Sequence, residues 1–325
     1  MASVIRAIVV LLWMVMPMIS AAAAAPQVIV TIKPIHSLVA MVMQGVAEPK
    51  LLIASGASPH TYSLRPSDAQ TLQQADLVFW VGDGLETFLE KPLKALPQNA
   101  RVVALAEAPA ITLLPYRSSA GWEPHVHGAA DSETPHEHEE SHAHDDDHEH
   151  HNTDMHIWLD PENAQAIVRA VAAALSEADP SHAAIYNSNA EAALSRLQAL
   201  DGTLRRTLEP LAGRPYVVFH DAYQYLEHRY GLTPVGSITV DPDRQPSARR
   251  VATIRQSITE RGAVCVFSEP QFSPKLIPTL IEGTTARTGT LDAEGGPTVP
   301  AGPDAYVVIM LNLADALRRC LTPPG

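Results

Sequence analysis

Nine of the fifteen histidines of this chain lie in one stretch, residues 123–151, together with ten acidic residues and no Lys or Arg. Imidazoles and carboxylates are side chains that bind divalent cations such as zinc. Because the stretch holds few apolar residues, we expect a disordered insert that binds metal weakly. The alternatives are a solvated acidic loop and a tag, although a tag would lie at a terminus. The histidines of the insert are His125, His127, His136, His138, His142, His144, His148, His150 and His151.

Three further histidines lie next to expected elements of secondary structure. Two follow apolar runs that predict strands, and one precedes an expected helix. His60 comes shortly after residues 51–54, His156 stands just before an expected helix, and His220 directly follows residues 216–219. Ligands of open α/β sheets bind at the carboxyl ends of the strands, so these imidazoles could converge in a cleft between two lobes. A single histidine of this kind is more often an ordinary polar residue. The insert, however, ends five residues before His156 and favours a shared metal site.

Three imidazoles and a bound water also form the zinc site of some hydrolases, which need a general base beside the water. Only Asp221 or Asp292 offers itself as that base, and neither a His-Glu-x-x-His pattern nor a nucleophile elbow occurs in the sequence. We therefore expect a binding protein and not an enzyme. A zinc buffer is the other alternative. It would bind many ions with similar affinity, whereas a receptor would bind one ion tightly.

The charge of the chain is concentrated in one region. The sequence has 36 acidic and 23 basic residues, a formal net charge of −13, and 13 of the acids lie between residues 118 and 168 without any basic residue. The rest of the chain carries equal numbers of both. This local acidity favours cations and argues against nucleic acid as a partner. With 325 residues, 46% of them hydrophobic, the chain is long enough for two domains.

The first 25 residues have the composition of a secretory signal peptide. Arg6 is their only charge, residues 7–19 are apolar, and the alanines of residues 21–25 suit cleavage near Ala25. The apolar run is short for a membrane span, and it contains no cysteine for lipid attachment. We therefore expect export across the inner membrane and a mature protein in the periplasm.

Short β-rich runs alternate with helical patterns along the mature chain. Asp160 and Pro161 suit the N-cap and first turn of a helix, and residues 67–70 (SDAQ) suit a capping box. The alternation predicts an α/β fold with mainly parallel sheets. We expect an N-terminal lobe at 26–180 that carries the insert, a linker helix at 181–210 and a C-terminal lobe at 211–325. The expected strands are residues 28–32, 51–54, 77–81, 102–105, 216–219, 235–239, 263–267 and 289–291.

Cys265 and Cys320 are the only cysteines, and neither has a partner at metal-ligand spacing. In an exported protein such a pair predicts a disulfide bond. Cys265 lies in an expected strand and Cys320 at the end of the last expected helix, so the bond would fasten that helix to a sheet. Closing a loop of about 55 residues stabilises the fold by about 4 kcal/mol in the chain-entropy model.

Six segments resemble the substrate-binding proteins of bacterial zinc ABC importers, the high-affinity zinc uptake family ZnuA of the cluster A-I group. They are KP at residues 33–34, PHTYSLRPSD at 59–68, MHIWL at 155–159, VFHDAY at 218–223, FSEPQF at 267–272 and GTLD at 289–292. The resemblance covers nearly all of the mature chain. It implies two pseudo-symmetric lobes joined by a long backbone helix, with Zn²⁺ held in the interlobe cleft by His60, His156 and His220.

The resemblance also implies a function and its partners. The protein would be a monomer that captures Zn²⁺ and delivers it to the membrane permease of an ABC importer, with a periplasmic zinc chaperone as a further candidate partner. Similar proteins for manganese or iron have a carboxylate at the position of His220, and three imidazoles suit zinc better. Close relatives often have an acidic residue where this chain has Pro59. That leaves water, Asp292 or an insert histidine as the fourth ligand, and we expect water with Asp292 nearby.

Overall fold

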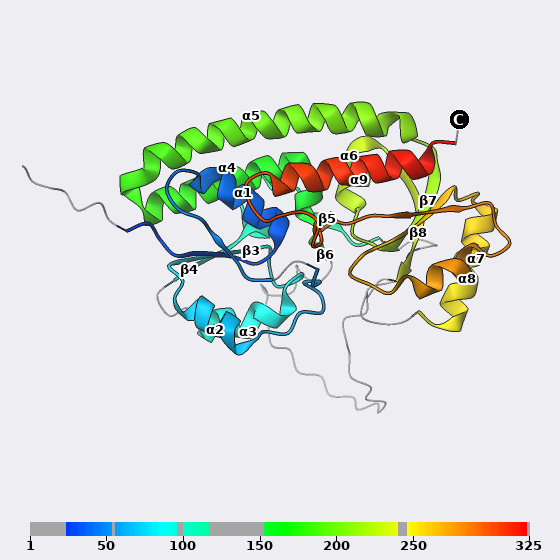
Figure 1. Cartoon of the computed structure of the whole chain (residues 1–325), viewed down its shortest axis with the longest axis horizontal. Coiled ribbons are helices and arrows are strands. Elements are labelled where there is room, and N and C mark those ends of the chain that lie inside the picture. The colour runs from blue at the N-terminus through cyan, green and yellow to red at the C-terminus, as the bar shows by residue number, and fades with distance from the viewer. Residues whose placement is uncertain are drawn as a thin grey trace, which may run out of the picture.

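The computed structural model describes residues 24–53, 56–95, 100–117, 122, 153–239 and 246–323. Within these residues, two four-stranded sheets lie towards the two ends of the molecule, and helices pack against both (Figure 1). All strand pairs of these two sheets are parallel. This confirms the α/β class with mainly parallel sheets. The predicted signal segment up to residue 23 and the insert at 123–151 lie outside the described residues.

The N-terminal sheet has the strand order β2-β1-β3-β4. Its central strands are apolar on both faces, as parallel strands covered by helices are, and Val30, Val78 and Phe79 are fully buried. The elements of this lobe are β1 (Val28–Val30), α1 (Lys33–Met43), β2 (Lys50–Leu51), α2 (Pro66–Gln73), β3 (Leu77–Trp80), η1 (Thr87–Leu89), α3 (Glu90–Ala95), β4 (Arg101–Ala104) and η2 (Leu105–Glu107).

Helix α2 has its N-cap at Arg65, two residues before the N-cap Ser67 of the predicted capping box at 67–70, so that prediction was wrong in its register. Pro66 occupies the first helical position, where its fixed φ is already that of a helix and its missing N–H costs nothing. Asp68 then lies three residues after the N-cap, and its carboxylate accepts the backbone N–H of Arg65 at 2.9 Å.

A hairpin and two long helices connect the lobes. They comprise β5 (Leu114–Pro115), its antiparallel partner β6 (Thr153–Asp154), η4 (Ile157–Leu159), α4 (Pro161–Ala178), η5 (Pro180–His182), α5 (Ala183–Leu208) and η6 (Glu209–Leu211). The predicted N-cap of α4 is confirmed, because the Asp160 carboxylate accepts the Glu162 N–H at 2.8 Å. Helix α5 spans both lobes along one side of the molecule (Figure 1).

The C-terminal sheet has the strand order β10-β9-β7-β8. Its elements are β7 (Pro215–His220), α6 (Gln224–Tyr230), β8 (Thr233–Thr239), α7 (Ala248–Glu260), β9 (Cys265–Ser268), η7 (Pro274–Leu276), α8 (Ile277–Ile281), β10 (Arg287–Thr290) and α9 (Ala305–Leu321). The predicted disulfide is present between Cys265 of β9 and Cys320 of α9. It fastens the last helix to the sheet.

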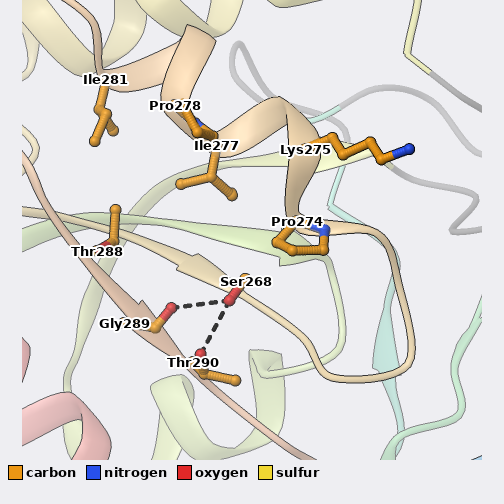
Figure 2. A pocket seen from close by; sticks show the side chains of 9 residues that line it. All are labelled: Ser268, Pro274, Lys275, Ile277, Pro278, Ile281, Thr288, Gly289 and Thr290. Atoms are coloured by element: carbon orange, nitrogen blue, oxygen red, sulfur yellow. Dashed lines mark hydrogen bonds between the residues drawn. The ribbon is translucent and has the colours of Figure 1, made fainter.

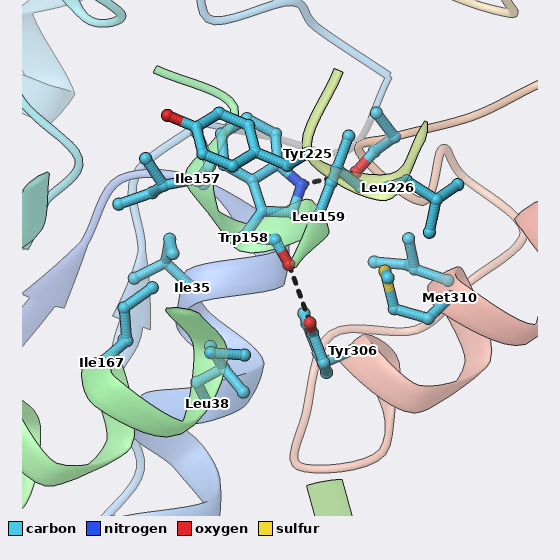
Figure 3. Close-up of a cluster of buried hydrophobic side chains, with 14 of the residues drawn as sticks. Ile35, Leu38, Ile157, Trp158, Leu159, Ile167, Tyr225, Leu226, Tyr306 and Met310 are labelled. Atoms are coloured by element: carbon cyan, nitrogen blue, oxygen red, sulfur yellow. Dashed lines mark hydrogen bonds between the residues drawn. The ribbon is translucent and has the colours of Figure 1, made fainter. Parts of the chain in front are cut away.

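One continuous apolar core lies under both lobes. Figure 3 shows its central part, where side chains from α1, α4, α6 and α9 surround Trp158. The Trp158 indole N–H donates to the Ala293 carbonyl at 3.1 Å, and Tyr306 donates its hydroxyl hydrogen to the Trp158 carbonyl at 2.7 Å. Because Trp158 is fully buried, it fixes the segment that begins at His156, two residues earlier.

Candidate metal centre

The structure brings His60, His156 and His220 together from three distant parts of the chain. His60 lies in the turn after β2, His156 directly precedes η4, and His220 is the last residue of β7. His156 Nε2 lies 3.2 Å from His60 Nε2 and 3.4 Å from His220 Nε2. The three rings therefore direct the same nitrogen towards one point. In the part of the chain that the structure describes, these three histidines could hold a metal ion together, because their donor nitrogens all lie within 4.8 Å of one another.

Buried carboxylates hold two of the three rings. The Nδ1 atom of His156 lies 2.7 Å from Asp154 Oδ1, and the Nδ1 atom of His220 lies 2.7 Å from Glu269 Oε1. A carboxylate accepts hydrogen bonds, so each Nδ1 carries the proton and each Nε2 keeps a free lone pair. Each of these rings thereby presents an Nε2 lone pair to the place where the three histidines meet.

The pKa values of the two buried imidazoles move in opposite directions. Burial lowers the pKa of His156 well below its ordinary value, and the charge of His220 lowers it further. Burial also disfavours the charged form of His220, but the charge and hydrogen bond of Glu269, with Asp221 and Asp154, raise its pKa above the ordinary value. His156 is therefore neutral at physiological pH, and His220 is the imidazole at which a proton would compete with a metal ion.

A small cavity surrounds the three Nε2 atoms, and residues of both lobes line it. They are Ser58, Pro59, His60, His156, His220, Glu269, Gln271, Phe272, Ala293 and Glu294. Burial raises the pKa of the Glu294 carboxyl to about 8, and the nearby carboxylates of Asp292, Glu86 and Glu269 contribute. The cavity wall thus contains carboxyl groups as well as imidazoles.

Asp292 lies behind this wall. Its Oδ1 atom accepts hydrogen bonds from Gln271 Nε2 at 2.8 Å, from the Gly295 N–H at 2.9 Å and from the Glu294 N–H at 3.2 Å. Gln271 therefore stands between Asp292 and the cavity, and its own Oε1 atom is buried without a hydrogen-bond partner among the described residues. An amide oxygen in this position can accept a hydrogen bond from a group inside the cavity.

Comparison with known proteins agrees with this geometry. A family model described as zinc-uptake complex component A, periplasmic (ZnuA), matches residues 28–320. This chain belongs to that family. The high-affinity zinc uptake system protein ZnuA of Brucella suis biovar 1 is 45% identical over 306 residues, which cover 91% of each chain. The protein of the same name from Paracoccus denitrificans is 40% identical over 308 residues, which cover 93% of each chain.

Solved structures confirm the fold of this ZnuA-family chain. The periplasmic zinc binding protein TroA of Treponema pallidum superposes with a TM-score of 0.75 at 24% identity, covering 92% of this chain and 100% of TroA. A crystal structure of ZnuA gives a TM-score of 0.73 at 23% identity, with 92% and 100% covered. At these identities the likeness concerns the fold alone. The family resemblance proposed from the six sequence segments is confirmed by the family match and the closer sequence relatives.

Sequence reasoning overlooked several residues of the site in this ZnuA-family chain. The sequence patterns assigned no role to Glu269 or Asp154, yet each orients a histidine. Glu269 directly follows β9, which is the sheet neighbour of β7. A carboxylate directly after an expected strand was therefore the sequence feature that could have identified Glu269 as part of the site. Gln271 and Glu294 line the cavity, but nothing in the sequence pattern distinguished them.

Other histidines named in the sequence do not contribute to the centre. His36 is buried in α1, where its Nε2 lies 2.8 Å from the Pro49 carbonyl oxygen. His182 contacts Asp179, and His228 is exposed on α6. The nine insert histidines lie outside the described residues.

A larger pocket borders the edge strand β10 in the C-terminal lobe. Figure 2 shows Ser268, Thr288 and Thr290 on one side and Ile277, Pro278 and Ile281 of α8 on the other. The nine residues that line this pocket include no imidazole or carboxylate, and Lys275 is their one titratable side chain. It therefore lacks the donors of a zinc site. No helix in the described part of the chain has the length and apolar character of a membrane span.

Proposed function

We propose that this protein captures Zn²⁺ in the interlobe cleft through the Nε2 atoms of His60, His156 and His220. The spacing of these atoms carries the proposal. Zn–N bonds of 2.0–2.1 Å in a tetrahedral site separate the nitrogens by about 3.3 Å, and His156 Nε2 lies 3.2 and 3.4 Å from the other two Nε2 atoms. Three nitrogen donors also suit zinc better than manganese, which favours oxygen ligands.

The surroundings of the rings fit a doubly charged ion. Three neutral imidazoles leave the charge of Zn²⁺ uncompensated, and burying an unpaired charge is costly. Asp154 and Glu269 lie behind two of the imidazoles, and both are almost completely buried. Two carboxylates can therefore balance the two charges of the ion without binding it directly.

Water is the fourth ligand in this proposal. Pro59 lines the cavity but has no side-chain donor, and the Asp292 carboxylate is engaged by Gln271 and two backbone N–H groups. A water on zinc could donate a hydrogen bond to the unpartnered Oε1 atom of Gln271. Asp292 would then act through Gln271, by holding the amide in place.

The role in transport follows from the family. We infer that the loaded protein delivers its ion to the membrane permease of an ABC zinc importer, after export to the periplasm and cleavage near Ala25. The stretch at 123–151 would collect zinc at low affinity beside the tight site. Mass spectrometry of the exported protein should give an N-terminus near Pro26, and zinc uptake by vesicles carrying such a permease should depend on the added protein.

Zinc titration against a chelating competitor tests the metal site. His60→Ala, His156→Ala and His220→Ala should each lose the tight equivalent, whereas His228→Ala, which changes an exposed histidine of α6, should keep it. Zinc at about a thousand times its dissociation constant stabilises the native state by about 4 kcal/mol. The melting temperature of the wild type should therefore rise with zinc, and that of each ligand variant far less. Full zinc-induced shifts in all three ligand variants would refute the assignment.

A further inference from the structure

Arg117 forms an ion pair with Asp221, the residue that follows the proposed zinc ligand His220. It also forms an ion pair with Glu227. Its Nη2 atom donates to Asp221 Oδ1 at 2.6 Å and to Glu227 Oε2 at 2.5 Å, and its Nε atom donates to Asp221 Oδ2 at 3.2 Å. The guanidinium also lies over the Trp122 ring, 3.8 Å from its centre. The side chain is 18% exposed, so most of it is shielded from water.

The partners of Arg117 are linked to β7, the strand that ends in a proposed ligand. Asp221 directly follows His220, and Glu227 accepts the hydroxyl hydrogen of Tyr216, which lies in the same strand β7, at 2.8 Å. Both carboxylates have side chains only 3% exposed. Such buried charges need an oppositely charged partner, because burying an unpaired charge costs free energy. Arg117 provides it and thereby fixes the chain on the far side of His220.

The same arginine lies close in the chain to the hairpin that carries the carboxylate beside a second histidine. That carboxylate is the buried Asp154, whose Oδ1 lies 2.7 Å from His156 Nδ1. Arg117 follows β5 by two residues, and β5 pairs with β6, which contains Asp154. Tyr225 joins this hairpin to α6 by accepting the Leu114 N–H at 3.1 Å and donating to the Asp154 carbonyl at 2.5 Å.

We infer that Arg117 is a positioning residue of the metal centre. It binds Asp221, the residue after His220, and it follows strand β5, which pairs with the strand β6 that contains Asp154. One guanidinium therefore ties the chain at His220 to the hairpin whose carboxylate holds His156. Loss of this group would let the two imidazoles separate and would raise the dissociation constant for zinc. The inference rests on the proposed zinc site, and it concerns a residue that binds no metal itself.

Arg229 provides a matched control, because it has a comparable structural environment away from the centre. Its side chain is 14% exposed. Its Nε and Nη2 atoms bind the Asp201 carboxylate at 2.8 and 2.9 Å, and its Nη1 atom lies 2.9 Å from Glu162 Oε2. It thus joins α6 to α5 and α4, as Arg117 joins its hairpin to β7 and α6. None of its partners in these bonds contacts a proposed zinc ligand.

The experiment compares Arg117→Gln and Arg229→Gln in the mature protein. Three quantities are measured: the melting temperature without metal, the zinc dissociation constant by chelator competition, and the visible absorption of the protein loaded with Co²⁺, which reports coordination geometry. Both variants should melt at lower temperature than the wild type. Only Arg117→Gln should raise the zinc dissociation constant, by about 10–100-fold as for other groups that orient metal ligands, and change the cobalt spectrum.

Arg117→Lys keeps the charge but loses the planar fork that binds Asp221 at two points, so its zinc affinity should lie between those of the wild type and Arg117→Gln. This variant decides the question if Arg117→Gln does not fold. Equal zinc constants and equal cobalt spectra in the Arg117 and Arg229 variants would overturn the inference. A wild type without tight zinc binding would instead overturn the proposed function, so the two failures are distinguishable.

Discussion

The substitution Glu269→Gln would remove one negative charge beside the proposed metal site. It would keep the size of the side chain and an oxygen that accepts a hydrogen bond. In the structure, Glu269 Oε1 lies 2.7 Å from His220 Nδ1, and the residue is 4% exposed. The amide of Glu269→Gln can accept the same hydrogen bond. The substitution therefore isolates the effect of the charge on zinc binding from the effect of orienting the ring.

The expected loss follows from the distance between the carboxylate and the ion. One imidazole ring separates them, so they lie about 6–7 Å apart, given a Zn–N bond of about 2 Å. At an effective dielectric constant of about 20, the attraction between one negative charge and Zn²⁺ at that distance is about 5 kcal/mol. Burial of the carboxylate offsets part of it. Measured effects of such groups are 10–100-fold, or about 1.4–2.7 kcal/mol, and we expect a rise of the dissociation constant in this range.

Competition with a chromophoric chelator measures the dissociation constant of Glu269→Gln and of a control, Glu260→Gln, which changes an exposed glutamate at the end of α7. The control should bind zinc as the wild type does. If Glu269→Gln binds zinc within twofold of the control, the carboxylate contributes no useful charge, and the account of charge balance in the site is wrong.

Three more outcomes follow from the same site. Deleting residues 123–151 should leave one tight zinc equivalent in an equilibrium titration and remove weaker ones, because the three proposed ligands lie elsewhere. Asp292→Asn should weaken binding modestly, about 10–100-fold, since it acts through Gln271; a loss as complete as that of a ligand variant would contradict this. Because the pKa of His220 is raised, its protonation should weaken binding as the pH falls through that raised pKa, and Glu269→Gln should shift the onset of this loss to lower pH.

The secondary structure was largely readable from the sequence because local signals determine it. Runs of β-branched residues formed the strands, and Asp160 with Pro161 started α4 as predicted. The disulfide was also predictable, because an exported chain with two cysteines offers one pairing. The start of α2 was misplaced by two residues, because a Ser at the N-cap and a Pro at the first helical position both favour a helix start and local propensity does not choose between them.

The carboxylates that orient His156 and His220 could not be predicted from the sequence in the same way. Glu269 and His220 are 49 residues apart, and they meet because β9 lies beside β7 in the sheet. Strand order depends on how the whole lobe packs, which a local pattern does not encode. Asp154 lies two residues before His156 and was close enough to suspect. Its function depends on the turn between them, which positions the carboxylate against the ring.

In the proposed site, the position of Asp292 would allow zinc to be held and still released. To bind the ion directly, its Oδ1 atom would have to give up hydrogen bonds to Gln271, Glu294 and Gly295, each contributing about 1 kcal/mol. The loop is also held from the other lobe, because the Lys33 ammonium donates to the carbonyls of Gly295, Gly296 and Val299. A carboxylate anchored in this way stays behind the wall and leaves the fourth place to an exchangeable water. The ion would then be held by three neutral nitrogens, and separation of the lobes would release it, since the histidines come from both.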